Sequence, residues 1–321
     1  MGLTKQSIKY IVQSRREFRA NMTTGRRQDS WYLLALLACL SFLPISCLAN
    51  ENDQLFAKIS RYAAIANSAY LAKPEAQKII EAQGYRLTRF SRIPEVEVTY
   101  LVATNDAEKH QIIAVRGTAN VENAIVDVSL KLLMDKHAHI LLHQGFAQAA
   151  ESIYKEVLPT LNKDYTISTT GHSLGGAVAL ILAMYLNKDQ HITGPVITFG
   201  QPKVTNISGA LAFKQLDVIR VVTARDLVPL VPPLDPMDIN NLNIYWHLGK
   251  EIVLLPNKDY AELEGLKSMM RATRIINTTL SQDNLEYHKM IHYLKQIKRK
   301  VKDARRVPYD TSIDLLKLFG Q

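Results

Sequence analysis

Residues 169–177, with the sequence TTGHSLGGA, place one serine between a strand and a helix and decide the fold of this chain. The short segment Tyr165–Thr169 at their start is rich in β-branched residues, which is typical of a buried strand. The segment Leu174–Leu186 is apolar on nearly every side, which predicts a helix enclosed within the protein. The stretch therefore predicts a strand, a tight turn with Ser173 at its tip, and a buried helix.

Two glycines frame the serine in an arrangement that indicates a nucleophile elbow. Gly171 and Gly175 lie two residues on either side of Ser173, where so sharp a turn leaves no room for a Cβ atom. The turn would present Oγ at the carboxyl end of a sheet and point the N–H of Leu174 at a developing oxyanion, beside the positive end of the helix dipole. The alternative is an ordinary glycine-rich connection; the strand, the helix and Gly176 favour the elbow.

The string TGHSLGGA at residues 170–177 resembles the class 3 lipase family of α/β-hydrolases, which includes the filamentous-fungal triacylglycerol lipases. The blocks VRGT (115–118), HQGF (143–146), TFGQP (198–202) and RDLVP (225–229) agree with that family in the same order. The resemblance, over residues 97–294, implies an α/β-hydrolase fold and an exported serine lipase or esterase that hydrolyses lipid esters through an acyl-serine. It also implies that the backbone N–H of Thr118 is the second oxyanion donor.

A serine nucleophile needs an acid, which follows it along the chain in α/β-hydrolases. Asp226 fits this role because it lies in the turn after a predicted strand, 217–222, and within the family's RDLVP block. An ion pair with Arg225 is the structural alternative. Asp235 and Asp238 remain as other candidates for the acid.

The base should be a histidine that follows the acid. His288 begins the string HKMIHYL, which resembles the family's His-x-Met-x-x-Tyr-Leu signature at the head of the last helix, so His288 is the predicted base. His292, one helical turn later, is the alternative. His247 lies in the alternating segment Ile244–Ile252, which predicts a strand and a structural role.

The first 49 residues have the pattern of a signal segment. An apolar run at 31–45 follows Arg26 and Arg27 and precedes the small-residue sequence that ends at Ala49, the predicted cleavage site. This pattern predicts export to the periplasm or the medium. Attachment to a membrane through an uncleaved leader or a lipidated Cys47 is the alternative; a twin-arginine-like motif at 14–18 and a translation start at Met22 also remain open.

The composition of residues 50–321 bounds the function. Their number suits a single α/β domain. The leader contains seven Lys or Arg and two acids, so it supplies +5 of the formal +9 and leaves about +4 for the rest. No zinc-finger spacing or phosphate-binding loop is present, so a nucleic-acid partner is not expected. Both cysteines, Cys39 and Cys47, lie in the leader.

Strands alternate with helices along the remaining chain, which predicts an α/β fold with a mainly parallel central sheet and helices on both faces. The predicted strands are 96–103, 111–115, 165–169, 196–199 and 217–222. The predicted helices are 55–70, 146–161, 174–186, 206–214, 261–275 and a basic closing helix after His288. The basic helix is either an ordinary solvated face or a contact with anionic lipid.

Residues 119–142 are the candidate lid. Val121, Ile125, Val128 and Leu132 recur at helical spacing, which suits either an amphipathic helix that covers the serine or a fixed part of the core. His137, His139 and His143 lie nearby without an accompanying carboxylate or a rigid ligand spacing, so a metal is not predicted. The chemistry requires no cofactor.

The same three side chains serve several reactions, so alternatives to a lipase remain. A phospholipase A, a lysophospholipase and a soluble carboxylesterase would all use Ser173, His288 and Asp226. A catalytically silent α/β-hydrolase relative that binds lipid or a partner is the alternative of another class. The intact set of three residues argues against a silent relative.

Overall fold

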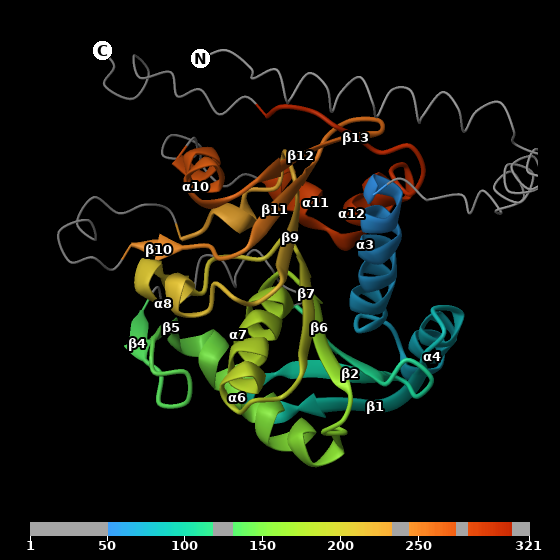
Figure 1. The fold of residues 1–321 in the computed structure, drawn as a ribbon, viewed down its shortest axis with the longest axis vertical. Helices are drawn as coiled ribbons and strands as arrows, with labels where there is room; N and C mark the ends of the chain where they lie inside the picture. Colours follow the sequence, from blue (N-terminus) through green and yellow to red (C-terminus); the bar gives the residue numbers. More distant parts are fainter. Residues whose placement is uncertain (1–50, 118–130, 233–243, 274–281, 310–321) are drawn as a thin grey trace, which may run out of the picture. The chain divides into compact units, whose positions relative to one another are not determined.

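The computed structural model describes residues 51–117, 131–232, 244–273 and 282–309 (Figure 1). The predicted leader, 1–49, lies outside these ranges. The α-helices are α3 (Glu51–Ser68), α4 (Lys73–Ala82), α6 (Gln144–Val157), α7 (Leu174–Lys188), α8 (Ile207–Ala212), α10 (Gly265–Thr273), α11 (Gln282–His288) and α12 (Met290–Lys298). Short 3-10 turns cover Pro94–Val96, Leu158–Thr160 and Val228–Leu230.

The described strands form a nine-stranded sheet in the order β1-β2-β3-β6-β7-β9-β11-β12-β13. Its five central strands, from β3 to β11, are parallel, and β1, β2 and β12 pair antiparallel at the sides. The bounds are β1 (Arg86–Ile93), β2 (Val98–Asn105), β3 (His110–Val115), β6 (Thr166–His172), β7 (Thr193–Phe199), β9 (Val218–Thr223), β11 (Lys250–Leu254), β12 (Asp259–Leu263) and β13 (Arg305–Arg306). The predicted α/β fold with a mainly parallel sheet is confirmed.

Helices cover both faces of this sheet because its strands are apolar on both sides. Along β2, Tyr100 and Val102 enter the core beneath α6 and α7, whereas Leu101 and Ala103 enter the core beneath α3 and α12. Figure 1 shows these two pairs of helices on opposite sides of the central strands. The helix α7 is buried along almost its whole length, as its uniformly apolar sequence predicts.

Four other described strands form a separate antiparallel sheet in the order β10-β8-β5-β4. It contains β4 (Leu132–Met134), β5 (Leu141–His143), β8 (Thr205–Asn206) and β10 (Tyr245–Trp246). Leu132 therefore begins a strand, and the predicted lid helix does not include it. Residues 119–130 of the candidate lid lie outside the described ranges.

Three further predictions of secondary structure were wrong. The segment 244–252 is two strands, because the chain bends at Gly249, whose φ of +77° suits glycine. Residues 261–263 belong to β12 rather than to a helix, and α10 starts only at Gly265. His288 ends α11 instead of beginning the last helix, and the last helix, α12, ends at Lys298.

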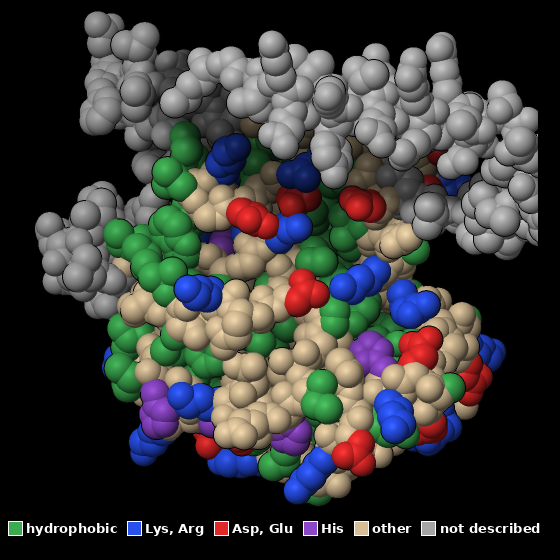
Figure 2. Space-filling model, viewed as in Figure 1, with side chains coloured by type: hydrophobic (Ala, Val, Ile, Leu, Met, Phe, Trp, Pro, Cys, Tyr) green, Lys and Arg blue, Asp and Glu red, His purple; other side chains and the backbone are tan. Residues whose placement is uncertain are grey.

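Charged side chains on the face drawn in Figure 2 are intermixed in sign, with lysines and arginines beside aspartates and glutamates. In the described part of the chain, every helix is too short or too polar to span a membrane.

Candidate active site

The strand β6 and the helix α7 hold Ser173 in a turn that few side chains adopt. Ser173 has φ +60° and ψ −134°, a strained conformation for any residue other than glycine. A Cβ atom at Gly171 would lie 2.4 Å from the carbonyl oxygen of Gly175, and one at Gly175 would lie 2.3 Å from that of Val115. Both positions therefore require glycine. Leu174 occupies the first position of α7, where the backbone N–H has no acceptor within the helix.

A buried carboxylate accepts hydrogen bonds from three sides at the end of β9. His288 Nδ1 donates to Asp226 Oδ2 at 2.7 Å, the Tyr293 hydroxyl donates to the same oxygen, and the Val228 N–H donates to Oδ1 at 2.9 Å. Burial alone would raise the pKa of Asp226, but the neighbouring His288 and these hydrogen bonds together hold that pKa below its usual value. Asp226 is therefore ionised and fixes the Nδ1–H tautomer of His288.

The serine and this His288–Asp226 pair meet through the strand β7. Ser173 N–H donates to the carbonyl of Phe199 at 2.8 Å. A Cβ atom on the next residue, Gly200, would lie 2.8 Å from His288 Cε1 and 2.9 Å from Asp226 Oδ2. Gly200 also has a φ of +59°, so both its conformation and its surroundings exclude a side chain.

Two buried polar atoms at this place have no hydrogen-bond partner. Ser173 Oγ and His288 Nε2 are both buried and unpaired within the described structure. Buried polar groups are nearly always satisfied, and exceptions gather at functional sites. A serine hydroxyl and the free nitrogen of an acid-bound imidazole are the two groups that nucleophilic catalysis requires.

A chain of hydrogen bonds with fixed directions connects the elbow to the base. His172 Nε2 lies 2.7 Å from the carbonyl oxygen of His288, which can only accept, so Nε2 carries the proton. His172 Nδ1 must then accept from the Tyr70 hydroxyl at 2.8 Å, and the Tyr70 oxygen accepts from the N–H of Gly117 at 3.1 Å. The His172 ring also stacks on that of His288 at 4.6 Å.

Burial keeps the two side chains in this series of hydrogen bonds, His172 and Tyr70, uncharged. Desolvation and the neighbouring His288 lower the pKa of His172 to about 3. Desolvation raises the pKa of Tyr70 to about 12, against the hydrogen bond from Gly117. The direction of the hydrogen bonds is therefore the same throughout the physiological pH range.

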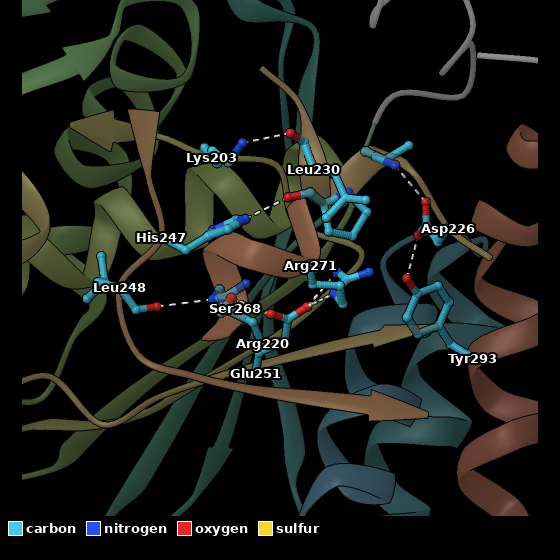
Figure 3. Close-up of polar contacts among 12 residues, drawn as sticks. Lys203, Arg220, Asp226, Leu230, His247, Leu248, Glu251, Ser268, Arg271 and Tyr293 are labelled. Atoms are coloured by element: carbon cyan, nitrogen blue, oxygen red, sulfur yellow. Dashed lines mark hydrogen bonds and ion pairs between the residues drawn. The ribbon is translucent and has the colours of Figure 1, made fainter. Parts of the chain in front are cut away.

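The turn after Asp226 is held by side chains that bind its carbonyl groups (Figure 3). Lys203 Nζ donates to the carbonyls of Leu230, at 2.7 Å, and Pro232, at 2.6 Å. His247 Nε2 donates to the carbonyl of Pro229 at 2.6 Å. Burial and the nearby arginines lower the pKa of Lys203 to about 7 and hold that of His247 well below its usual value.

A buried ionic cluster lies beside this turn (Figure 3). Glu251 of β11 pairs with Arg271 of α10 and with Arg220 of β9, and the Ser268 hydroxyl donates to Glu251. Arg220 also donates to the carbonyl of Leu248 at 3.1 Å. These contacts fasten α10 to the sheet strands that precede and follow the acid turn.

The structure thus brings together Ser173, Leu174, Asp226 and His288 among the residues that the sequence singled out. Other candidates are not in this site or lie outside the described ranges. His292 contacts Glu286 on an exposed surface, at 3.3 Å. Thr118, Asp235 and Asp238 lie outside the described ranges.

Five residues that shape the site were not predicted from the sequence: Tyr70, His172, Lys203, Gly200 and Tyr293. His172, Gly200 and Tyr293 lie within the family-like blocks TGHSLGGA, TFGQP and HKMIHYL, whereas Tyr70 and Lys203 lie outside all of these blocks.

Comparison with known proteins relates part of this chain to a family. Residues 112–235 match the family model described as Lipase (class 3). The secreted mono- and diacylglycerol lipase 1 of Fusarium solani is 35% identical over 142 residues, which cover 41% of this chain and 42% of that protein. A lipase of Rhizopus niveus is 29% identical over 198 residues, 55% of this chain and 50% of that protein. Residues 112–235 of this chain are therefore similar to the class 3 lipase family.

A solved structure agrees with the fold described above. The lipase from Rhizopus microsporus var. chinensis superposes with a TM-score of 0.54 at 25% identity, over 63% of this chain and 75% of that one. The chain spans half or less of the length of the Fusarium and Rhizopus niveus sequences it matches. His288 lies beyond the residues that the family model matches, so its place in the site comes from the geometry above.

Proposed function

We propose that this chain is an exported serine hydrolase that cleaves carboxylic ester bonds of lipids. One observation carries the proposal: Ser173 Oγ and His288 Nε2 are buried and have no hydrogen-bond partner among the described residues, while His288 Nδ1 donates to the ionised Asp226. The family match of residues 112–235 supports the lipid ester class of substrate. The name of the Fusarium relative and the pattern of residues 1–49 support export.

The reaction follows from the roles that these groups can take. Ser173 Oγ attacks the ester carbonyl while His288 Nε2 accepts its proton, and Asp226 stabilises the resulting imidazolium. The N–H of Leu174, and on the resemblance that of Thr118, donate to the oxyanion of the tetrahedral intermediate. His288 then returns the proton to the leaving alkoxide, and water releases the fatty acid from the acyl-serine by the same steps.

The burial of Ser173 adds a condition to this mechanism. Ser173 is 0% exposed, so a lipid ester can reach Oγ only after part of the protein moves aside. The enclosure also excludes water and strengthens the electrostatic interaction between Asp226 and His288. We propose that an opening step precedes acylation.

The test compares the full chain with its Ser173→Ala variant. We expect turnover of fatty-acyl esters by the wild type and a loss of about 10⁴-fold or more in kcat for the variant. A fluorophosphonate probe should label the wild type at Ser173 and leave the variant unlabelled. Hydrolysis by the variant at the wild-type rate, or an unlabelled wild type that is also inactive on every ester, would contradict the proposal.

The substrate panel separates the alternatives within ester hydrolysis. Monoacyl, diacyl and triacyl glycerol, diacyl and monoacyl phospholipid, and short soluble esters should be compared at equal ester concentration. Preference for the acylglycerols is the expected result. A preference for phospholipid would identify a phospholipase A or lysophospholipase, and turnover of short esters alone would identify a carboxylesterase.

A further inference from the structure

A cationic pocket of about 270 Å³ lies outside the triad, between the ends of β9 and β11 and one face of α12. Part of its lining is apolar and consists of Leu254, Pro256 and the ring of Tyr287. The other part carries His292 and three cations, Arg225, Lys295 and Arg299, and no acidic side chain among the described residues lines it. The pocket therefore combines an apolar wall with concentrated positive charge.

These cations are not neutralised by their neighbours. Within the described ranges, no ion pair involves Arg225, Lys295 or Arg299, whereas three other exposed cations of the same region are paired. The paired ones are Lys258 with Asp303, Lys289 with Glu286, and Arg305 with Asp259. Uncompensated charge in a concavity with low-dielectric walls focuses the field and raises the local concentration of anions.

The positions of the cations are set by the fold. Lys295 and Arg299 are four residues apart, so they project from the same face of the helix end. Arg225 lies over the Tyr287 ring, 4.8 Å from its centroid, and donates to the Tyr287 hydroxyl. This aromatic contact orients the guanidinium, which suits binding of an oxyanion through two oxygens.

A fourth positive charge lies behind the apolar wall. Lys300 is 0% exposed, and its ammonium donates to the carbonyls of Leu255 and Asn257 at 2.7 and 2.9 Å. These two residues flank Pro256 in the pocket lining. Lys300 therefore fixes the wall and adds to the positive potential there.

We propose that this pocket binds the anionic head of an amphiphilic lipid, a carboxylate or a phosphate with an attached apolar chain. The oxyanion would accept hydrogen bonds from Arg225, Lys295 and Arg299, and the start of the chain would pack on Leu254 and Tyr287. Arg225 precedes Asp226 and Tyr287 precedes His288, so an occupied pocket contacts both segments that carry the proposed acid and base. The inference concerns binding alone and holds whether or not the chain hydrolyses esters.

The test measures binding on the full chain with Ser173→Ala, so that hydrolysis plays no part. Octyl phosphate and octanoate below their micellar concentrations are titrated calorimetrically at constant ionic strength. Inorganic phosphate and octyl glucoside test the head and the chain separately. We expect saturable binding of at least one of the two anionic amphiphiles, with weaker binding of inorganic phosphate and of the neutral glucoside.

A matched pair of double variants tests the location. Lys295→Gln with Arg299→Gln removes two pocket cations, and Lys298→Gln with Lys302→Gln removes two exposed cations that do not line the pocket. Each lost charge-assisted hydrogen bond should weaken binding about tenfold, so the first variant should bind about 100-fold more weakly and the second within about twofold of the parent. Equal losses in both variants would show general surface electrostatics and overturn the site.

Two other results would also overturn the proposal. Inorganic phosphate that binds as tightly as octyl phosphate would indicate a site for the free anion instead of a lipid head. Absence of saturable binding by either anionic amphiphile would indicate no such site at all. Thermal unfolding of each variant checks that its fold is intact, which is expected because all four substituted side chains are exposed.

Discussion

The hydrogen-bonded chain from Gly117 through Tyr70 and His172 to His288 can be broken by removing one atom. Tyr70→Phe deletes the hydroxyl and retains the ring, which contacts the Arg116 guanidinium at 5.6 Å and the His172 ring at 5.8 Å. The substitution leaves two buried groups without partners, the N–H of Gly117 and Nδ1 of His172. Each unsatisfied group costs about 1–3 kcal/mol, so the free energy of unfolding should fall by about 2–6 kcal/mol.

The effect of Tyr70→Phe on activity follows from the groups that these hydrogen bonds position. Gly117 immediately precedes Thr118, the proposed oxyanion donor, and His172 binds the backbone of the proposed base. Loss of a whole oxyanion donor costs about 10²–10³-fold in kcat, which sets the upper limit for a donor that is merely loosened. We expect kcat to fall about 10- to 100-fold with KM little changed, because no substrate-binding group is removed.

Another tyrosine–histidine pair in the protein provides a control for this substitution. Tyr85 and His110 form the same kind of pair, with an O–N distance of 2.8 Å and ring centroids 5.8 Å apart, at the far end of β3 from Gly117. Tyr85→Phe should destabilise the protein by about 1 kcal/mol and leave kcat unchanged, because it breaks one bond to a histidine that is partly exposed. Urea unfolding and ester hydrolysis are measured on both variants. A kcat for Tyr70→Phe within twofold of that for Tyr85→Phe would refute the positioning role.

Two further predictions use the same measurements. Tyr293→Phe removes a hydrogen bond from the buried carboxylate of Asp226, so the free energy of unfolding should fall by about 1.5–3 kcal/mol at pH 7. Because that hydrogen bond favours ionised Asp226, the stability it contributes is fully present above the unfolded-state pKa of about 3.9 and is lost as the pH falls through the lower pKa of the folded state. Urea unfolding at pH 3 should therefore show a smaller difference in stability between Tyr293→Phe and the wild type than at pH 7. An equal difference at the two pH values would contradict the argument. The free energy of unfolding should also fall on acidification below about pH 6.5, because three histidines bind protons in the unfolded state but stay neutral when buried in the folded state. The expected slope is about 4 kcal/mol per pH unit near pH 5 for the three residues together. A free energy of unfolding that is independent of pH from 7 to 5 would contradict this. The three are His143, with its pKa lowered by burial to about 4, His172 and His247.

The parts of the fold that could be predicted have strong local signals. The strand β6 and the helix α7 follow from a β-branched run, two crowded glycines and a continuous apolar segment, and no distant residue is needed to recognise them. The edge strand β1 was missed because its sequence, RLTRFSRI, is mostly polar and its side chains are only partly buried. The strand β12 was assigned to a helix because a five-residue strand next to α10 presents too few positions to reveal its period.

The parts of the site that escaped prediction depend on tertiary contacts. A lysine in sequence is expected on the surface, and nothing near Lys203 indicates that two backbone carbonyls 27 and 29 residues later receive its ammonium. Tyr70 and His172 are 102 residues apart, and His172 and His288 are 116 apart. Only the tertiary fold joins them, because it places the residues after α3 and the end of α11 beside His172 at the end of β6.

The residues that position the proposed acid and base mostly bind backbone carbonyls instead of carboxylates. His172 binds the carbonyl of His288, while Lys203 and His247 bind the turn after Asp226. A carbonyl acceptor does not titrate, and the two histidines stay neutral well below pH 6, so the direction of these two histidine bonds does not change with pH in that range. Lys203, whose pKa is lowered to about 7, is the donor of this group that titrates near neutral pH. Asp226 is the ionised carboxylate of the site, and its Oδ2 accepts a hydrogen bond from Nδ1 of His288. In the proposed mechanism, the proton moves from Ser173 Oγ to His288 Nε2, two buried atoms that have no hydrogen-bond partner within the described residues.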